Sequence, residues 1–401
     1  MGARVMIMGR GEPPQKMKMA PRPLIVPPPQ PSPRGRGSEG ASRIFRVMIM
    51  AAGTGGHVFP GLAVAQELHK RGHEVFWLGT PNGMENRLVP PAGIEMEFIS
   101  MQGLRGNGLM RLVTAPFQLL RSAWQAARVI RRRRPDVALG MGGFVTGPGG
   151  LMARLLGVPL VIHEQNAVPG MANQWLAGIA GRVLEAFPGS FAPGKGALAL
   201  GNPVRAEISA LPGPEQRLAG REGPPRLLVI GGSLGAQVLN EQVPQALAKS
   251  GLVIEVRHQT GRGKLEQTQA NYRAAGVEGS LSEFIADMAE AYAWADLVVC
   301  RAGALTVSEL AAAGVAAILV PYPFAVDDHQ TRNARYLSDR GAAILMPQQA
   351  MTPERMGAEL KMILSDRDRL LAMASAARGL GITNGDSRVA DVCEEMMAHE
   401  L

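Results

Sequence analysis

A glycine-rich segment that leads into a histidine is the first place where residue types and spacing suggest chemistry. Residues 50–61 read MAAGTGGHVFPG, between an apolar run and a helical pattern. A strand that turns through glycines into a helix leaves unpaired backbone N–H groups at the turn, and the helix dipole favours anions or electron-rich oxygens there. Gly53, Gly55 and Gly56 let a ligand approach the backbone closely, and His57 begins the helix beside them. The segment indicates a ligand site, with a plain strand-to-helix turn as the alternative.

Two segments in the second half of the chain carry groups that suit a nucleotide and a sugar. Residues 301–309 read RAGALTVSE after an apolar run, so Gly303 and the first helical N–H groups suit a diphosphate. Glu309 lies about two turns into that helix, where a carboxylate can accept both ribose hydroxyls, although a solvated glutamate is the alternative. Residues 327–333 read DDHQTRN and can bind sugar hydroxyls, although Asp327 or Asp328 also suits a helix N-cap.

A polar segment follows an apolar run in the first half of the chain. Residues 163–166 read HEQN where the mouth of a site is expected. The spacing gives no pair of histidine ligands on one helical face, so a metalloprotease motif is excluded. Simple capping of a loop is the alternative to a role in binding.

An arginine-rich amphipathic segment suggests contact with a membrane surface. Between Glu97 and Asp136 there are eight arginines and no acid, including the run from Arg131 to Arg134. Apolar residues recur beside them at helical spacing, which is most simply the core face of a helix. An excess of arginine beside leucine, phenylalanine and tryptophan is also typical of a helix on a lipid surface. We predict membrane contact through Leu109, Leu112, Phe117, Leu120, Trp124, Arg131, Arg132, Arg133 and Arg134.

The elements that must position these groups alternate between strands and helices. Short apolar runs predict strands at 74–78, 96–99, 137–141, 160–163, 227–230, 253–256, 297–300, 317–320 and 344–346. Such βαβ series predict parallel sheets with helices on both faces. A Pro/Gly-rich stretch at 212–225 separates two series, and GGSLG at 231–235 repeats the opening strand–turn–helix pattern. We therefore predict two similar domains, with ligands at the carboxyl ends of the strands.

Composition limits the class of protein. The formal charge of +8 is mostly that of residues 1–43, which carry +6 and nine prolines, so no global nucleic-acid footprint is expected. That segment has no apolar core long enough for a signal peptide and is predicted to be disordered. Two distant cysteines provide neither a disulfide framework nor a metal finger, which fits a reducing cytoplasm. No uncharged run is typical of a membrane span.

Nine motifs in order carry a resemblance to a known family over residues 46–398. They are AGTGGHVFPGLAVA, LGTPNGMENRLVP, GLRG, GMGGFVTGPGG, HEQN, GNPVR, GGSLGA, CRAGALTVSE and DDHQTRNA. The chain resembles the MurG family of family 28-like glycosyltransferases, which convert lipid I to lipid II in peptidoglycan synthesis. The departures are Ala52, where glycine is common, and His329, where some members have glutamine.

The resemblance implies an α/β protein of the GT-B fold, with two Rossmann-like, doubly wound parallel-sheet domains facing a central cleft. It implies an N-terminal acceptor domain at 44–205, joined by a C-terminal helix at 383–401, and a nucleotide domain at 206–382. The acceptor domain is expected to face the cytoplasmic side of the bacterial inner membrane, as a peripheral protein on anionic phospholipid.

The resemblance also implies roles for individual residues. Thr54, Gly55, Gly56 and Asn166 are expected at the sugar, Arg205 at the donor, Ser233 at the diphosphate and Ile285 at the uracil. Phosphates and ribose are expected at Ala304, Leu305, Thr306, Val307, Ser308 and Glu309, and Gln330 at the GlcNAc hydroxyls. Its position at the glycine-rich turn, rather than the resemblance, makes His57 the expected general base. Glu164 is the competing candidate, and the third possibility is that His57 only orients the acceptor.

The expected reaction is inverting transfer of GlcNAc from UDP-GlcNAc to the 4-hydroxyl of MurNAc in undecaprenyl-diphosphate-MurNAc-pentapeptide, or lipid I. No metal is expected to be required, because N–H groups at helix N-termini can stabilise the charge of the leaving UDP, although Mg²⁺ could assist. The alternatives are a non-hydrolysing UDP-GlcNAc epimerase and an inactive nucleotide-binding scaffold of the envelope.

Overall fold

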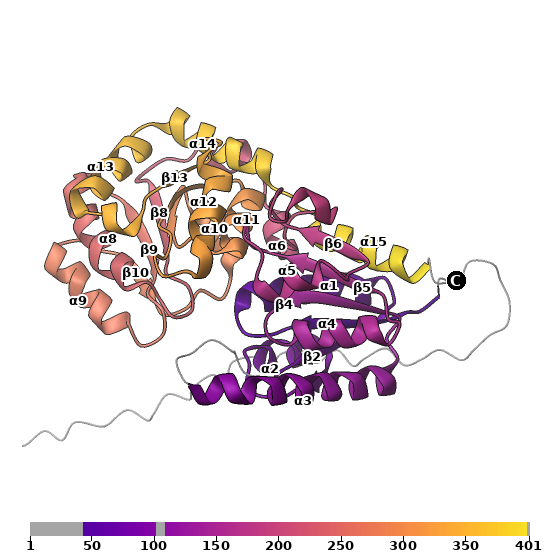
Figure 1. Ribbon diagram of the computed structural model, residues 1–401. Helices are drawn as coiled ribbons and strands as arrows, with labels where there is room; N and C mark the ends of the chain where they lie inside the picture. Colours follow the sequence, from indigo (N-terminus) through magenta and orange to yellow (C-terminus); the bar gives the residue numbers. More distant parts are fainter. Residues whose placement is uncertain (1–42, 102–108, 399–401) are drawn as a thin grey trace, which may run out of the picture. The chain divides into compact units, whose positions relative to one another are not determined.

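The first half of the chain folds into a seven-stranded parallel sheet. A computed structural model describes residues 43–101 and 109–398, and the described residues from Ile44 onward form one compact unit (Figure 1). The strand order is β3-β2-β1-β4-β5-β6-β7, so the order reverses between β1 and β4. The strands are β1 (Arg46–Ala51), β2 (Glu74–Gly79), β3 (Glu95–Phe98), β4 (Val137–Gly142), β5 (Leu160–Glu164), β6 (Arg182–Glu185) and β7 (Leu198–Ala199).

Helices cover both faces of this sheet. Alternate residues of β1 pack into two hydrophobic cores, one on each face of the sheet, because successive side chains of a strand point to opposite faces. Val47 and Ile49 pack with the residues of α1, whereas Met48 and Met50 pack on the side of α3. The helices are α1 (Gly55–Lys70), α2 (Glu85–Leu88), α3 (Leu109–Arg133), α4 (Thr146–Leu155) and α5 (Met171–Leu176).

The second half forms a six-stranded parallel sheet of the same plan. Its order is β10-β9-β8-β11-β12-β13, which reverses between β8 and β11. The strands are β8 (Arg226–Ile230), β9 (Glu255–Gln259), β10 (Ser280–Ser282), β11 (Leu297–Cys300), β12 (Ala316–Leu319) and β13 (Ala343–Leu345). The helices are α6 (Ala206–Ser209), α7 (Pro214–Leu218), α8 (Gln237–Ser250), α9 (Leu265–Ala275), α10 (Met288–Trp294), α11 (Ala304–Ala313), α12 (His329–Ser338), α13 (Pro353–Leu364) and α14 (Arg367–Leu380).

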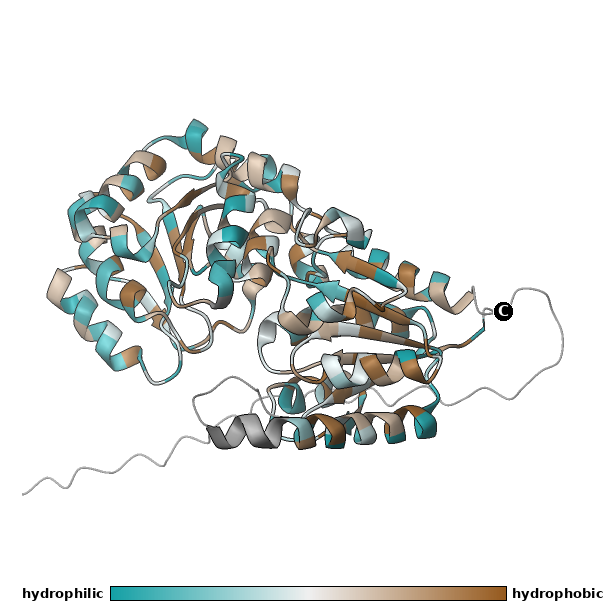
Figure 2. Cartoon of the chain, viewed as in Figure 1, coloured by the Kyte–Doolittle hydropathy of each residue, from teal (hydrophilic) through white to brown (hydrophobic). Residues whose placement is uncertain are grey.

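The two predicted parallel sheets are confirmed, and Figure 2 shows their strands as largely hydrophobic elements between helices. The strand predicted at 253–256 is displaced: β9 covers Glu255–Gln259, and Val253 is exposed. Three short strands were not predicted, namely β6, β7 and β10. Strands β7 and β10 lie at sheet edges, where little apolar sequence is needed because few side chains are buried.

The last helix, α15 (Gly385–Ala398), returns to the first sheet and packs against α1. Val389 and Cys393 enter the same core as the residues of α1. Arg71, at the end of α1, donates to Asp391 at 2.6 Å and to Glu394 at 3.0 Å. The chain therefore completes the first core with its final residues.

Candidate active site

The loop after β1 leaves the backbone N–H groups at the start of α1 without a side chain that caps them. Gly53 has a φ of +101°, which favours glycine, and a Cβ there would meet nothing within 4 Å. Thr54 is the extended N-cap of α1, and its hydroxyl makes no capping hydrogen bond. Gly55 and Gly56 then form the first turn of the helix. The structure thus brings together the exposed Thr54, two glycines and His57 at one helix start.

The ring of His57 packs against the loops that follow β4 and β5. Gly142 has a φ of +106°, and a Cβ on it would lie 2.7 Å from His57 Nδ1. A Cβ on Gly143 would lie 2.1 Å from the carbonyl oxygen of Ala52, so the loops after β1 and β4 touch through their backbones. On the β5 side, Nδ1 of His57 is 2.8 Å from Oε1 of Gln165. The ring is therefore held at the point where the strand order reverses.

Glu164 is engaged by its own loop. The residue is only 1% exposed, and one carboxylate oxygen accepts hydrogen bonds from the backbone N–H and the side-chain amide of Asn166. The other oxygen accepts from the Gly170 N–H and from Asn173 Nδ2, both at 3.0 Å. With four hydrogen bonds to its two oxygens, this carboxylate stabilises the conformation of the loop that contains Asn166.

The loops after β8 and β11 form the corresponding edge of the second sheet. Ser233 is exposed in the loop after β8. Gly303 is the extended N-cap of α11, and no side chain caps that helix. Ala304 and Val307 are buried; Leu305, Thr306 and Ser308 are half-buried. The first N–H groups of α11 can therefore receive an anion.

Glu309 lies in a buried ion pair. It is 3% exposed and accepts from Arg205 Nη2 at 2.6 Å, from Arg205 Nε at 3.1 Å and from the Tyr292 hydroxyl at 3.1 Å. Burial raises the pKa of Glu309, and the Arg205 charge opposes that rise. Arg205 also lies over the ring of Phe59 in α1, 5.7 Å from its centroid. A ribose bound here would have to share or displace these donors.

The remaining predicted donor contacts lie on a loop, at Ile285, and at a helix start, at Gln330. Ile285 is half-buried after β10 and packs against the core of the second sheet. Gln330 is half-buried at the start of α12, where its Oε1 accepts from the Tyr322 N–H at 2.9 Å. Asn333, which was not predicted, accepts from the Ala167 N–H at 2.8 Å and donates to Asn166 Oδ1 at 3.3 Å. It joins the loop after β5 to α12.

The predicted membrane face is apolar at its centre. Phe117, Leu120 and Trp124 on α3 are 76%, 69% and 62% exposed, and Figure 2 shows apolar and polar segments alternating along this helix. Leu109 and Leu112 begin the helix, but their side chains lie outside the described residues.

The basic end of that face is partly neutralised. Arg132 pairs with Glu97, and Arg133 pairs with both Glu97 and Glu95 on the neighbouring strand β3. Arg131 and Arg134 are exposed. The arginine run alone does not reveal these acids, because they lie on a separate strand that pairs beside α3 only in the fold. It also missed four exposed apolar residues on or beside α4 and α5: Phe144, Leu155, Met171 and Trp175.

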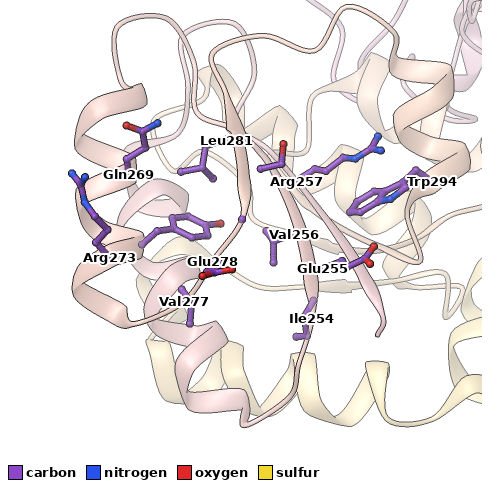
Figure 3. A pocket seen from close by; sticks show the side chains of 13 residues that line it. Ile254, Glu255, Val256, Arg257, Gln269, Arg273, Val277, Glu278, Leu281 and Trp294 are labelled. Atoms are coloured by element: carbon purple, nitrogen blue, oxygen red, sulfur yellow. The ribbon is translucent and has the colours of Figure 1, made fainter. Parts of the chain in front are cut away.

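A hollow of about 990 Å³ lies away from the sites just described. Its lining comes from β9, β10, α9 and the end of α10 and includes Tyr272, as well as Arg257 and Trp294, which Figure 3 labels. Arg257 stacks on Trp294, 4.2 Å from the ring centroid, and forms an ion pair with Glu290. Of the predicted site residues whose side chains are described, none lines this hollow.

Comparison with known proteins identifies the family. Residues 47–185 match the glycosyltransferase family 28 N-terminal domain, and residues 226–392 match the family 28 C-terminal domain.

The chain is 56% identical over 355 residues to proteins named UDP-N-acetylglucosamine–N-acetylmuramyl-(pentapeptide) pyrophosphoryl-undecaprenol N-acetylglucosamine transferase. In Aeromonas hydrophila the match covers 88% of this chain and 98% of the relative, and in Marinobacter nauticus it covers 87% and 97%. The crystal structure of MurG from Acinetobacter baumannii is 46% identical, with a TM-score of 0.76, and the match covers 88% of this chain and 99% of that one. The chain therefore belongs to glycosyltransferase family 28 and, within it, to the MurG family of N-acetylglucosamine transferases.

Proposed function

We propose that this protein transfers GlcNAc from UDP-GlcNAc to the MurNAc 4-hydroxyl of lipid I and so forms lipid II for peptidoglycan. The observation that carries the proposal is 56% identity, over nearly the whole length of the relatives, to proteins named for this transfer. The relatives are named as transferases, so neither an epimerase nor an inactive scaffold is favoured.

His57 is the proposed general base. The acceptor hydroxyl loses its proton as its oxygen attacks the anomeric carbon, and UDP departs from the opposite face with the electron pair of the broken bond. A positioned base typically accelerates such a step about 10²–10⁴-fold. His57 lies beside Thr54 and the helix start, whereas both oxygens of the competing candidate, Glu164, already hold two internal donors each.

The donor is proposed to bind at the second sheet. The N-terminus of α11 and the exposed Ser233 suit a diphosphate, because helix N–H groups and the helix dipole stabilise negative charge. These groups would also stabilise the leaving UDP, so the reaction requires no metal, although Mg²⁺ could assist. Gln330 would bind the GlcNAc hydroxyls, Ile285 the uracil and Glu309 the ribose.

The first domain is proposed to rest on the cytoplasmic surface of the inner membrane. Exposed Phe117, Leu120 and Trp124 would enter the interface, and the exposed Arg131 and Arg134 would meet anionic headgroups. Each arginine near such a surface contributes about 1 kcal/mol. Among the described residues, no helix combines the length and apolar character needed to cross a bilayer.

Transfer of labelled GlcNAc from UDP-GlcNAc to a soluble lipid I analogue tests the proposal. We expect one disaccharide product and one UDP per transfer, and a β linkage by NMR. A protein that binds UDP-GlcNAc but makes no product, or that releases the 2-epimer, would overturn it. The variant His57→Ala should lower kcat about 10²-fold or more while UDP binding persists.

A further inference from the structure

Behind His57, three groups form a continuous line of hydrogen bonds that the proposed reaction has not used. His57 Nδ1 lies 2.8 Å from Gln165 Oε1. Gln165 Nε2 lies 3.2 Å from both Nδ1 and the carbonyl oxygen of His163. His163 Nε2 lies 2.9 Å from the carbonyl oxygen of Gly201. His163, Gln165 and Gly201 are buried, so water does not compete for the contacts among these three residues.

The donor and the acceptor of each hydrogen bond in this line can be assigned by starting from the Gly201 carbonyl, at the end opposite His57. The Gly201 carbonyl can only accept, so His163 Nε2 carries a proton. Burial lowers the pKa of His163 to about 4, so its ring is neutral near pH 7 and its Nδ1 carries a lone pair. That lone pair and the His163 carbonyl both require a donor, and the amide nitrogen of Gln165 supplies it to both.

The orientation of the Gln165 amide then decides the protonation of His57. With the nitrogen facing His163, the amide oxygen faces His57 Nδ1, and an amide oxygen can only accept. Nδ1 of His57 must therefore carry the proton in the neutral ring, and Nε2 keeps its lone pair. Gly142 leaves room for the ring on another side, because a Cβ there would lie 2.7 Å from Nδ1.

We propose that Gln165 is a positioning residue that holds neutral His57 in the Nδ1–H tautomer, so that Nε2 is the atom that takes the acceptor proton. This inference rests on the proposed function, in which His57 is the base. During transfer the hydroxyl proton moves to Nε2, the oxygen bonds to the anomeric carbon, and UDP leaves with the electron pair. The resulting imidazolium keeps its Nδ1–H bond to Gln165, and it later returns the Nε2 proton to water.

The tautomer can be measured without turnover. In protein labelled with ¹⁵N-histidine, the two nitrogens of a neutral imidazole have well-separated shifts, and loss of one signal set in His57→Ala assigns His57. We expect wild-type His57 to show a protonated Nδ1 and a bare Nε2. A mixture of tautomers, or a protonated Nε2, in the neutral wild-type ring would refute the inference whatever the enzyme's activity.

Two variants of Gln165 separate positioning from general packing. Gln165→Leu removes the acceptor, so both tautomers of His57 should appear and kcat should fall about 10-fold or more, with little change in KM for UDP-GlcNAc. Gln165→Glu keeps an acceptor for Nδ1–H, so the His57 tautomer should be retained even if the His163 contact is lost. Gln165→Leu spectra that keep the wild-type tautomer, or Gln165→Glu spectra that lose it, would overturn the assignment.

A matched control exists in the second domain. There, His258 Nε2 lies 3.0 Å from the amide oxygen of Asn240, which is a buried imidazole–amide contact of the same kind. Asn240→Leu should leave the His57 signals unchanged, and a change in them would count against a local effect of Gln165. If Gln165→Leu shifts the tautomer but leaves kcat intact, the positioning holds and the proposed base is wrong instead.

Discussion

The ion pair between Arg205 and Glu309 should respond unequally to removal of its two partners. The side chain of Arg205 is 31% exposed, whereas that of Glu309 is 4% exposed. In Glu309→Gln the guanidinium can turn to water, and the lost contacts should cost about 1 kcal/mol of unfolding free energy. In Arg205→Met the carboxylate is left buried with only the Tyr292 hydroxyl, and breaking a buried pair in this way costs about 3–5 kcal/mol.

The pH dependence of this difference has a definite sign. Burial raises the pKa of Glu309 and the Arg205 charge restrains that rise, so the pKa should climb further in Arg205→Met. A carboxyl whose folded pKa lies above its unfolded value destabilises the fold at high pH. The cost of Arg205→Met should therefore be complete at alkaline pH and shrink as pH falls through the raised pKa, toward the ordinary value of 4.5.

Urea unfolding of both single variants and the double variant, followed by circular dichroism at several pH values, measures the loss of unfolding free energy in each variant. The double variant should be more stable than Arg205→Met alone, because no charge remains buried without a partner. If Arg205→Met is as stable as Glu309→Gln at every pH, the carboxyl is not ionised in the fold and the reasoning fails. Kinetics then test the ribose contact: Glu309→Gln should raise KM for UDP-GlcNAc about 10-fold or more and should hardly affect a 2′,3′-dideoxy donor.

Three further outcomes are expected. Burial lowers the pKa of His258 to about 3 from 6.5, so the unfolded chain takes up a proton at this group before the folded protein does as pH falls. The wild type should therefore lose about 2 kcal/mol of unfolding free energy through His258 by about pH 5. In His258→Gln the unfolding free energy, measured in urea, should depend less on pH. Gly142→Ala should lower kcat with little effect on UDP affinity by calorimetry, because its Cβ would strike the His57 ring. Trp124→Ala should weaken sedimentation with anionic vesicles at all salt concentrations, whereas Arg131→Glu should weaken it mainly at low salt and leave turnover of a soluble acceptor intact.

Much of the fold follows from patterns that are local in the sequence. Apart from Arg46 at the start of β1, the residues of β1 and β11 are buried on both faces, so the two runs are apolar and easily recognised. β10 has only three residues and none is fully buried, so its sequence carries no such pattern. The exposed Val253 shows the opposite error, since its apolar side chain lies before the strand and not within it.

The site was predictable to the extent that single segments define it. The glycine-rich turn and the start of α11 are each one continuous motif. The partners of Glu309 are different, because Arg205 and Tyr292 reach it from other segments, and nothing near residue 309 indicates them. Gln165 lay inside a segment predicted to be polar, but its role depends on the ring of His57, 108 residues earlier.

The return of α15 to α1 has a consequence for the order in which the protein folds. The first core includes Val389, Val392 and Cys393, which the ribosome makes after the whole second sheet. Domains generally fold as units during synthesis, usually from the N-terminus. Here the earlier domain must wait with part of its apolar surface uncovered, while the later one already has all its strands. The first core is completed only when α15 packs against α1, and contacts between residues so far apart in the sequence form slowly. Nascent chains that stop before residue 385 should therefore expose the α1 side of the first sheet to chaperones.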